Sequence, residues 1–163
     1  MMSNADNVLT MGLKAGYAGG SQRQTVTRGP FTLKATELSF PELDAKYNDH
    51  WIAKRIGGGQ EIAQTGDEMA TRVFAGGIVK PEKLQQLGIT EEQVMAYLKS
   101  TLPNVADRTR LHEPVDLAPD GDWKYTYTPM KDYPDLPLSI GVETISYKGE
   151  DVFVHVFLNT PIV

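Results

Sequence analysis

Cysteine is absent from the 163 residues of this sequence. Disulfide bonds, thiolate nucleophiles and cysteine-based zinc sites are therefore excluded. The sequence also has no run that approaches the roughly 20 apolar residues needed to cross a membrane. The first residues, up to Asp6, contain neither the basic nor the apolar segment of a secretory signal. We therefore expect a cytoplasmic protein that is not embedded in a membrane.

Positive charge is also scarce, because 16 Lys and Arg residues face 21 Asp and Glu residues, for a formal net charge of −5. The basic residues are scattered and form no cluster suited to a nucleic-acid backbone, so the composition disfavours nucleic-acid binding. The sequence has no Walker loop, no Gly-x-Ser-x-Gly elbow and no Gly-x-Gly-x-x-Gly motif. Its three histidines, His50, His112 and His155, do not have metal-ligand spacing. We expect no metal ion and no cofactor.

The pattern of apolar residues and turn signals predicts one α+β domain over residues 1–163. The clearest helix is 91–102, where Thr90 and Gln93 form a capping box and Pro103 ends the helix. Gly57-Gly58-Gly59 and the proline-rich segment 129–137 predict loops. The other expected elements are a helix over 6–15, a short helix between Pro81 and Gly88, and strands over 22–28, 31–40, 45–52, 60–65, 68–75, 122–128, 139–147 and 150–158.

One pattern occurs twice in the chain. Gly59-Gln60-Glu61, Gly66 and Val73-Phe74 recur as Gly141-Val142-Glu143, Gly149 and Val156-Phe157, and a predicted helix precedes each copy. The recurrence predicts an internal duplication, with pseudo-repeat halves of about 5–77 and 89–160. We expect a curved antiparallel sheet with pseudo-twofold symmetry and helices on one face.

The repeated glutamates are the candidate catalytic residues. With a turn at Lys148-Gly149, Glu143 pairs with Val154 and lies on an aliphatic face, where burial would raise its pKa as in a general acid or base. The alternative is a carboxylate held by an ion pair or by backbone hydrogen bonds. For Glu61, a turn centred on Gly66-Asp67 gives a surface pair with Arg72, whereas a turn centred on Thr65-Gly66 places Ala70 opposite. If the symmetry holds, Glu61 and Glu143 approach a shared cleft.

The segment Tyr47–Trp51 is rich in aromatic and polar residues. Tyr47, Asp49 and Trp51 share one face of the predicted strand, with Asn48 and His50 on the other. An aromatic pair that flanks a carboxylate suits a flat ligand, and the alternative is a half-buried strand with a satisfied aspartate. Tyr17, after the first helix, belongs to the same hypothesis. The predicted ligand-binding residues are Tyr17, Tyr47, Asp49, Trp51, Glu61 and Glu143.

Three segments carry a resemblance. They are Leu13–Gly20, then Tyr47-Asn48-Asp49 with Gly59-Gln60-Glu61, and finally residues 141–150. Together they resemble an uncharacterised bacterial domain family with Tyr-x-Asp and repeated Gly-x-Glu motifs, whose members stand alone or are fused to helix-turn-helix regulators. The resemblance implies a sensor or ligand-binding role without an assigned reaction. The polar strand after Gly20 and the segment 157–160 depart from the family pattern, and a regulatory role would need another chain.

We therefore expect a small-molecule or nucleotide-binding protein, a sensor or sequestering module, with a cleft between duplicated halves. Two alternatives remain open. One is an enzyme, a hydrolase, lyase or isomerase, that uses Glu61 or Glu143 as acid or base. The other is a protein-binding inhibitor or adaptor that acts through its acidic surface or a sheet edge. Edge pairing would also permit a homo-oligomer.

Overall fold

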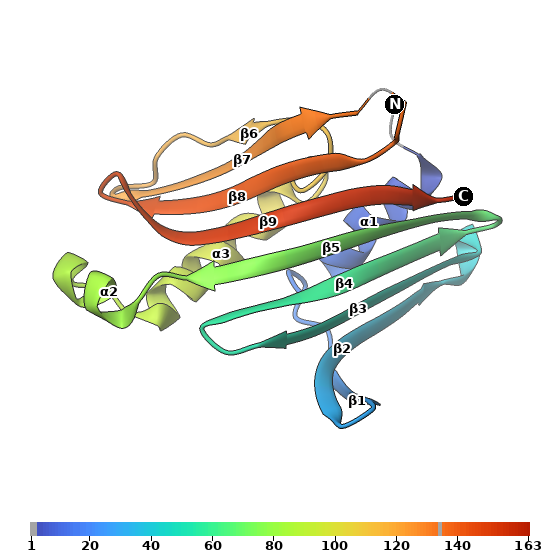
Figure 1. Cartoon of the computed structure of the whole chain (residues 1–163), viewed down its shortest axis with the longest axis horizontal. Coiled ribbons are helices and arrows are strands. Elements are labelled where there is room, and N and C mark those ends of the chain that lie inside the picture. Colours follow the sequence, from blue (N-terminus) through green and yellow to red (C-terminus); the bar gives the residue numbers. More distant parts are fainter. Residues whose placement is uncertain (1–2, 134) are drawn as a thin grey trace.

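The structure, a computed structural model, describes residues 3–133 and 135–163. Three residues of the predicted domain lie outside the described residues: Met1, Met2 and Pro134. Pro134 belongs to the predicted loop 129–137. A nine-stranded sheet runs in the order β1-β2-β3-β4-β5-β9-β8-β7-β6, and every neighbouring pair is antiparallel (Figure 1). The strands are β1 Gln24–Arg28, β2 Phe31–Phe40, β3 Ala45–Ala53, β4 Ile56–Thr65, β5 Glu68–Ile78, β6 Val115–Asp116, β7 Trp123–Asp132, β8 Ser139–Tyr147 and β9 Glu150–Ile162.

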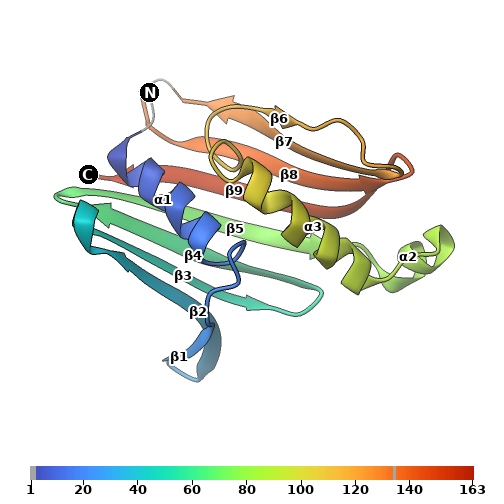
Figure 2. The same ribbon diagram turned by 180° about the vertical axis from the view of Figure 1, so that it is seen from behind.

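Three α-helices accompany the sheet: α1 Asn4–Ala15, α2 Pro81–Leu87 and α3 Glu91–Val105. In Figure 2 α1 and α3 lie in front of the sheet, and in Figure 1 both lie behind it. The predicted capping box of α3 is confirmed, because the Thr90 side chain accepts from the Gln93 amide and the Gln93 side chain accepts from the Thr90 amide. The predicted end at Pro103 is wrong. Proline removes one hydrogen bond, but burial of Leu102 and Val105 stabilises the last turn.

One predicted loop is a strand, and the first part of a second one is as well. Gly57-Gly58-Gly59 lies inside β4 and pairs with the residues from Trp51 to Ala53. A Cβ atom on Gly59 would lie 2.7 Å from the Phe74 ring, so the missing side chain allows close approach rather than flexibility. The segment after Thr128 continues as β7 to Asp132, because a bulge between Pro129 and Lys131 accommodates the proline.

The hairpin registers decide the partners of the repeated glutamates. In the β4–β5 hairpin the turn is centred on Gly66-Asp67, and Glu61 lies opposite Arg72. In the β8–β9 hairpin the Lys148-Gly149 turn is present, but the register shifts at a bulge between Ile145 and Ser146, just before the turn. The bulge shifts the register by one residue, so Glu143 pairs with His155 and not with the predicted Val154.

Two apolar clusters hold the helices against the sheet. The larger one joins Val94, Leu98 and Leu102 of α3 to residues of β7, β8 and β9 that include Tyr125 and Phe157. The smaller one joins α1 to Tyr47, Ala63 and Ala70. Gly12 allows this contact, because a Cβ atom there would lie 2.1 Å from the Tyr47 ring. Within the part of the chain that the structure describes, no helix has the length and apolar character that crossing a membrane requires.

Candidate functional site

Glu61 is a buried carboxylate whose charge is fully matched. Only 2% of the residue is exposed. Arg72, on the facing position of β5, donates from Nε to Oε2 at 2.5 Å and from Nη2 to Oε1 at 2.6 Å, and Tyr47 of β3 donates its hydroxyl to Oε1 at 2.6 Å. Burial acts to raise the pKa of Glu61, but the Arg72 guanidinium overcomes it and holds that pKa below its usual value. The predicted partner Arg72 is therefore correct, whereas its predicted surface location is wrong.

Glu143 has a similar environment on β8. Arg110 donates from Nε and Nη2 to the two carboxylate oxygens at 2.8 and 2.9 Å, and the Tyr125 hydroxyl donates to Oε1 at 2.7 Å. The Nδ1 atom of His155 lies 3.6 Å from Oε2. Burial alone would raise the pKa of Glu143, but the Arg110 guanidinium lowers it to about 2. The predicted raised pKa is therefore wrong, and the ion pair considered as its alternative is present.

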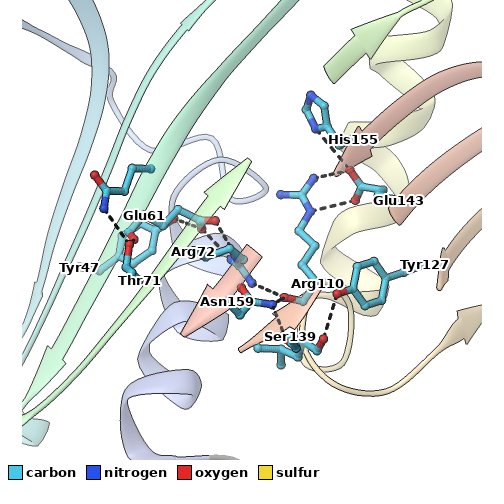
Figure 3. A network of polar contacts seen from close by, with 12 residues as sticks. Tyr47, Glu61, Thr71, Arg72, Arg110, Tyr127, Ser139, Glu143, His155 and Asn159 are labelled. Carbon is cyan, nitrogen blue, oxygen red and sulfur yellow. Dashed lines mark hydrogen bonds and ion pairs between the residues drawn. The ribbon is translucent and has the colours of Figure 1, made fainter. Parts of the chain in front are cut away.

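A single backbone carbonyl connects the two ion pairs (Figure 3). The carbonyl oxygen of Arg110 accepts from Nη1 of Arg72 at 3.2 Å and from Nδ2 of Asn159 at 2.8 Å. The side chain of Arg110 then reaches Glu143. Arg110 has a φ of 62°, in the left-handed region that non-glycine residues seldom adopt. These contacts hold the strained backbone and give a continuous chain from Glu61 through Arg72 and Arg110 to Glu143 (Figure 3).

A cavity of about 360 Å³ lies beside this network. It is bounded by the C-terminal part of α1 and the residues after it, by α3, and by β3, β4, β5 and β9. Its apolar lining includes Leu13, Phe74, Met95 and Phe153. A volume in this range is typical of sites for small organic molecules.

Among the residues that the structure describes, Asp49 of β3 is the buried acidic group of the cavity wall without a matching cation. The residue is 7% exposed, and its Oδ1 atom is buried with no hydrogen-bond partner in the described ranges 3–133 and 135–163. It pairs across the sheet with Glu61. Burial and the nearby Glu61 carboxylate raise the pKa of Asp49 to about 8, against the smaller lowering effects of Arg72 and Arg110.

Two aromatic rings adjoin Asp49. Tyr17 and Trp51 also line the cavity, and their rings meet edge to face with centroids 6.5 Å apart. The guanidinium carbon of Arg23, an exposed residue just before β1, lies 5.4 Å from the Tyr17 ring centroid and 5.9 Å from that of Trp51. The alternation of β3 explains this placement, because Ala45, Tyr47, Asp49 and Trp51 are all buried on one face, as predicted.

The structure brings four of the six predicted site residues to the cavity wall: Tyr17, Asp49, Trp51 and Glu61. Tyr47 and Glu143 are outside that wall. Tyr47 donates a hydrogen bond to Glu61, and Glu143 forms an ion pair with Arg110. Sequence reasoning missed Arg110 and Phe74 as wall residues. A buried glutamate signals the need for a cation, but no local pattern indicates that the cation for Glu143 comes from a segment 33 residues earlier.

Within residues 3–133 and 135–163, no group of three or more His, Asp and Glu side chains has an arrangement that could hold a metal ion. No protein-family model, no curated protein and no solved structure matches this chain. The resemblance to the bacterial domain family therefore stays a prediction, and function must be argued from the cavity and its charges.

Proposed function

We propose that this protein binds a small molecule in the cavity between α1 and α3. The observation that carries the proposal is an unpartnered carboxylate oxygen of Asp49 inside an aromatic-lined cavity of about 360 Å³. A buried polar atom without a partner is unfavourable, so its retention beside Tyr17 and Trp51 supports recognition of a ligand group. A sensor or a sequestering module is the function that this arrangement supports best.

We also infer the internal duplication, with halves of about 5–77 and 89–160. Its support is the matching surroundings of the two glutamates. Tyr47 pairs with the residue two positions after Glu61 and donates to that carboxylate. Tyr125 pairs with the residue two positions after Glu143 and donates likewise. The adjacent, antiparallel β5 and β9 would then contain the pseudo-twofold axis, with α1 and α3 covering one face of a curved sheet.

The duplication would explain where the cavity lies. Its wall takes Leu13, Trp51 and Phe74 from the first half, and Leu98 and Phe153 from the second. In this proposal a ligand contacts both halves. The buried chain from Glu61 to Glu143 keeps the wall rigid, because each of its charges is already satisfied.

An enzyme is the second candidate, and Asp49 rather than either glutamate favours it. A carboxyl with a pKa of about 2, such as Glu143, holds no proton to donate at neutral pH. The pKa of Asp49 is about 8, which suits a general acid or base near neutrality. Turnover of a bound compound that is lost in Asp49→Asn, while binding of the same compound persists, would establish this alternative.

A thermal-shift screen of a chemically diverse compound library tests the binding proposal. Because a ligand binds only the folded state, a compound at about 100 times its Kd stabilises the protein by about 2.7 kcal/mol. Met95 lies on the cavity wall, and Met95→Trp fills part of the space. Ala96 is the exposed neighbour on α3 and is not part of the wall, so Ala96→Trp is the matched control.

We expect compounds that raise the Tm of the wild type and of A96W but not of M95W. Native mass spectrometry of the purified protein would add the mass of any retained ligand. A library without stabilising compounds, or hits that stabilise M95W equally, would contradict binding in this cavity.

A further inference from the structure

The buried charged groups at and beside the cavity differ in whether each has an oppositely charged partner. Arg72 neutralises Glu61, and Glu143 neutralises Arg110, in both cases through two hydrogen bonds. Asp49 has no such partner, although it lies directly opposite Glu61 in the β3–β4 register. Like charges at facing positions repel each other. The ionised form of Asp49 would therefore add a negative charge that no buried cation matches, which keeps this carboxyl protonated at neutral pH until a cation binds.

The rings next to Asp49 already attract a cation. Aromatic faces stabilise a guanidinium or ammonium group within about 6 Å of the ring centroid. The guanidinium of Arg23 lies within that range of both Tyr17 and Trp51. Its residue is exposed and belongs to the segment that leads into β1. Arg23 thus occupies the aromatic pair in the way that a ligand cation would, from the solvent side.

We propose that the cavity binds a small organic cation, whose charged group lies between the Asp49 carboxylate and the rings of Tyr17 and Trp51 and displaces Arg23 from them. This inference rests on the proposed binding function and names the class of ligand. An amine, a guanidinium or a quaternary ammonium group attached to an apolar body meets the requirement. The body would contact the apolar wall at Phe74 and Met95.

Basic side chains also border the cavity, but they do not change the proposal that its ligand is a cation. Lys34, Lys54 and Lys99 are exposed, as is the acidic Glu92 on the same border. Arg55 is half-buried, and its guanidinium donates to the backbone carbonyl of Ile78 at 2.5 Å. Charges in contact with solvent are screened by water and salt, whereas a buried charge acts in a medium of lower dielectric constant. Asp49 is therefore the buried group with which an entering cation can pair, once its proton is released.

Binding of a cation should release a proton. Five groups face Asp49 or act on its charge: Glu61 on β4, Arg72 on β5, Tyr47 on β3, Arg110 after α3 and Tyr17 after α1. Burial is the main reason that the pKa of Asp49 is raised to about 8, and repulsion by the Glu61 carboxylate adds to it, so the Asp49 carboxyl is protonated at neutral pH. A cation favours the ionised carboxylate and so lowers the pKa of Asp49. Proton release should approach one per cation near pH 7 and vanish well above the free pKa of about 8.

Isothermal titration calorimetry with matched probes tests the inference. The probes are 2-phenylethylammonium, 2-phenylethanol and phenylacetate, which share one carbon skeleton and differ in charge. Titrations in phosphate and in Tris, whose ionisation enthalpies differ, count the protons released. We expect the ammonium to bind at least ten times more tightly than the alcohol, and we expect no binding of phenylacetate.

Three variants connect this selectivity to the named residues. Asp49→Asn should reduce the preference for the ammonium to about equality with the alcohol and abolish proton release. Asp67→Asn, in the exposed β4–β5 turn, is its control and should behave as the wild type. Arg23→Ala should tighten ammonium binding several-fold, because the competing guanidinium is gone.

Equal binding of the alcohol, or preferred binding of phenylacetate, would overturn the cation assignment while leaving the cavity as a binding site. Failure of all three probes with both the wild type and R23A would also overturn it. The failure of the binding proposal itself is distinct, since it would appear as a library screen without hits from any charge class. Unchanged selectivity in D49N would remove Asp49 from the site.

Discussion

Replacing Glu143 by glutamine should destabilise the protein far more than an ordinary surface substitution. Arg110 donates to both oxygens of Glu143 at 2.8 and 2.9 Å, and the two side chains are 9% and 0% exposed. Removal of one partner leaves the other charge buried without compensation, which costs about 3–5 kcal/mol. We therefore expect the free energy of unfolding of E143Q at pH 7 to fall by about that amount.

The pH dependence of stability gives a second value for the free energy of the Arg110–Glu143 ion pair. The pKa of Glu143 falls from an ordinary 4.5 to about 2 in the folded protein. Between these values the unfolded chain binds more protons than the folded one, so stability from the ionised carboxylate is complete above pH 4.5 and is lost as the pH falls toward 2. A shift of this size corresponds to about 3 kcal/mol, within the range expected for the substitution. The difference between wild type and E143Q should therefore shrink below pH 4.5.

Urea unfolding followed by tryptophan fluorescence measures both effects. The control is Glu150→Gln, which removes a carboxylate from the exposed Lys83–Glu150 pair and should change stability far less than E143Q does. Adding Arg110→Met to E143Q should restore part of the stability, because the unpaired buried charge is then gone. A loss of stability in E143Q no larger than that in E150Q, or a deficit that stays constant between pH 4.5 and 2, would contradict a stabilising buried ion pair.

Three further substitutions have defined outcomes. Tyr125→Phe removes the hydroxyl that donates to Glu143 and also contacts Thr109. Urea unfolding should show that the free energy of unfolding falls by about 1–2 kcal/mol. No loss would mean that Glu143 does not need this donor. Gly12→Ala places a methyl group 2.1 Å from the Tyr47 ring, so calorimetry should show a lower Tm, equivalent to about 1–3 kcal/mol. An unchanged Tm would show that α1 shifts freely. Asp49→Asn should stabilise the protein increasingly from pH 4 to pH 8. The pKa of Asp49 rises from 3.8 to about 8 on folding, so the wild-type protein loses stability as the pH rises through that window, and the asparagine variant does not. Parallel stability curves for D49N and wild type would contradict a raised pKa.

Several features of the fold and the site follow from short stretches of sequence. The alternation of Tyr47, Asp49 and Trp51 predicts a common buried face, and the structure confirms it. The spacing of Thr90 and Gln93 predicts the start of α3 in the same way. Turn geometry limits the partner of Glu61 to Arg72 or Ala70, and the structure has the Gly66-Asp67 turn that selects Arg72. In each case the cause is a local rule, since strand periodicity, capping and turn geometry involve residues that are close in the chain.

Other features depend on contacts between distant segments. The bulge at Ile145 places Glu143 opposite His155, and no turn residue signals it. Arg110 reaches Glu143 from an irregular segment, which turns an expected high pKa into a low one. Gly59 lies in a strand because β4 pairs with both β3 and β5, and the Phe74 ring occupies the space that a side chain there would need.

The chain's own order of residues was thus enough to specify an antiparallel α+β architecture and to include the wall residues Tyr17, Asp49, Trp51 and Glu61 among six predicted site residues. It also selected Tyr47 and Glu143, which lie outside the wall. Tertiary packing alone decided which carboxylates are neutralised. Arg72 and Arg110 satisfy the two glutamates, and Asp49 is left without a cation. The physical reason is that the ionisation of a buried carboxylate depends on the charges and the solvent within a few ångströms, which are set by three-dimensional contacts and not by neighbours in sequence.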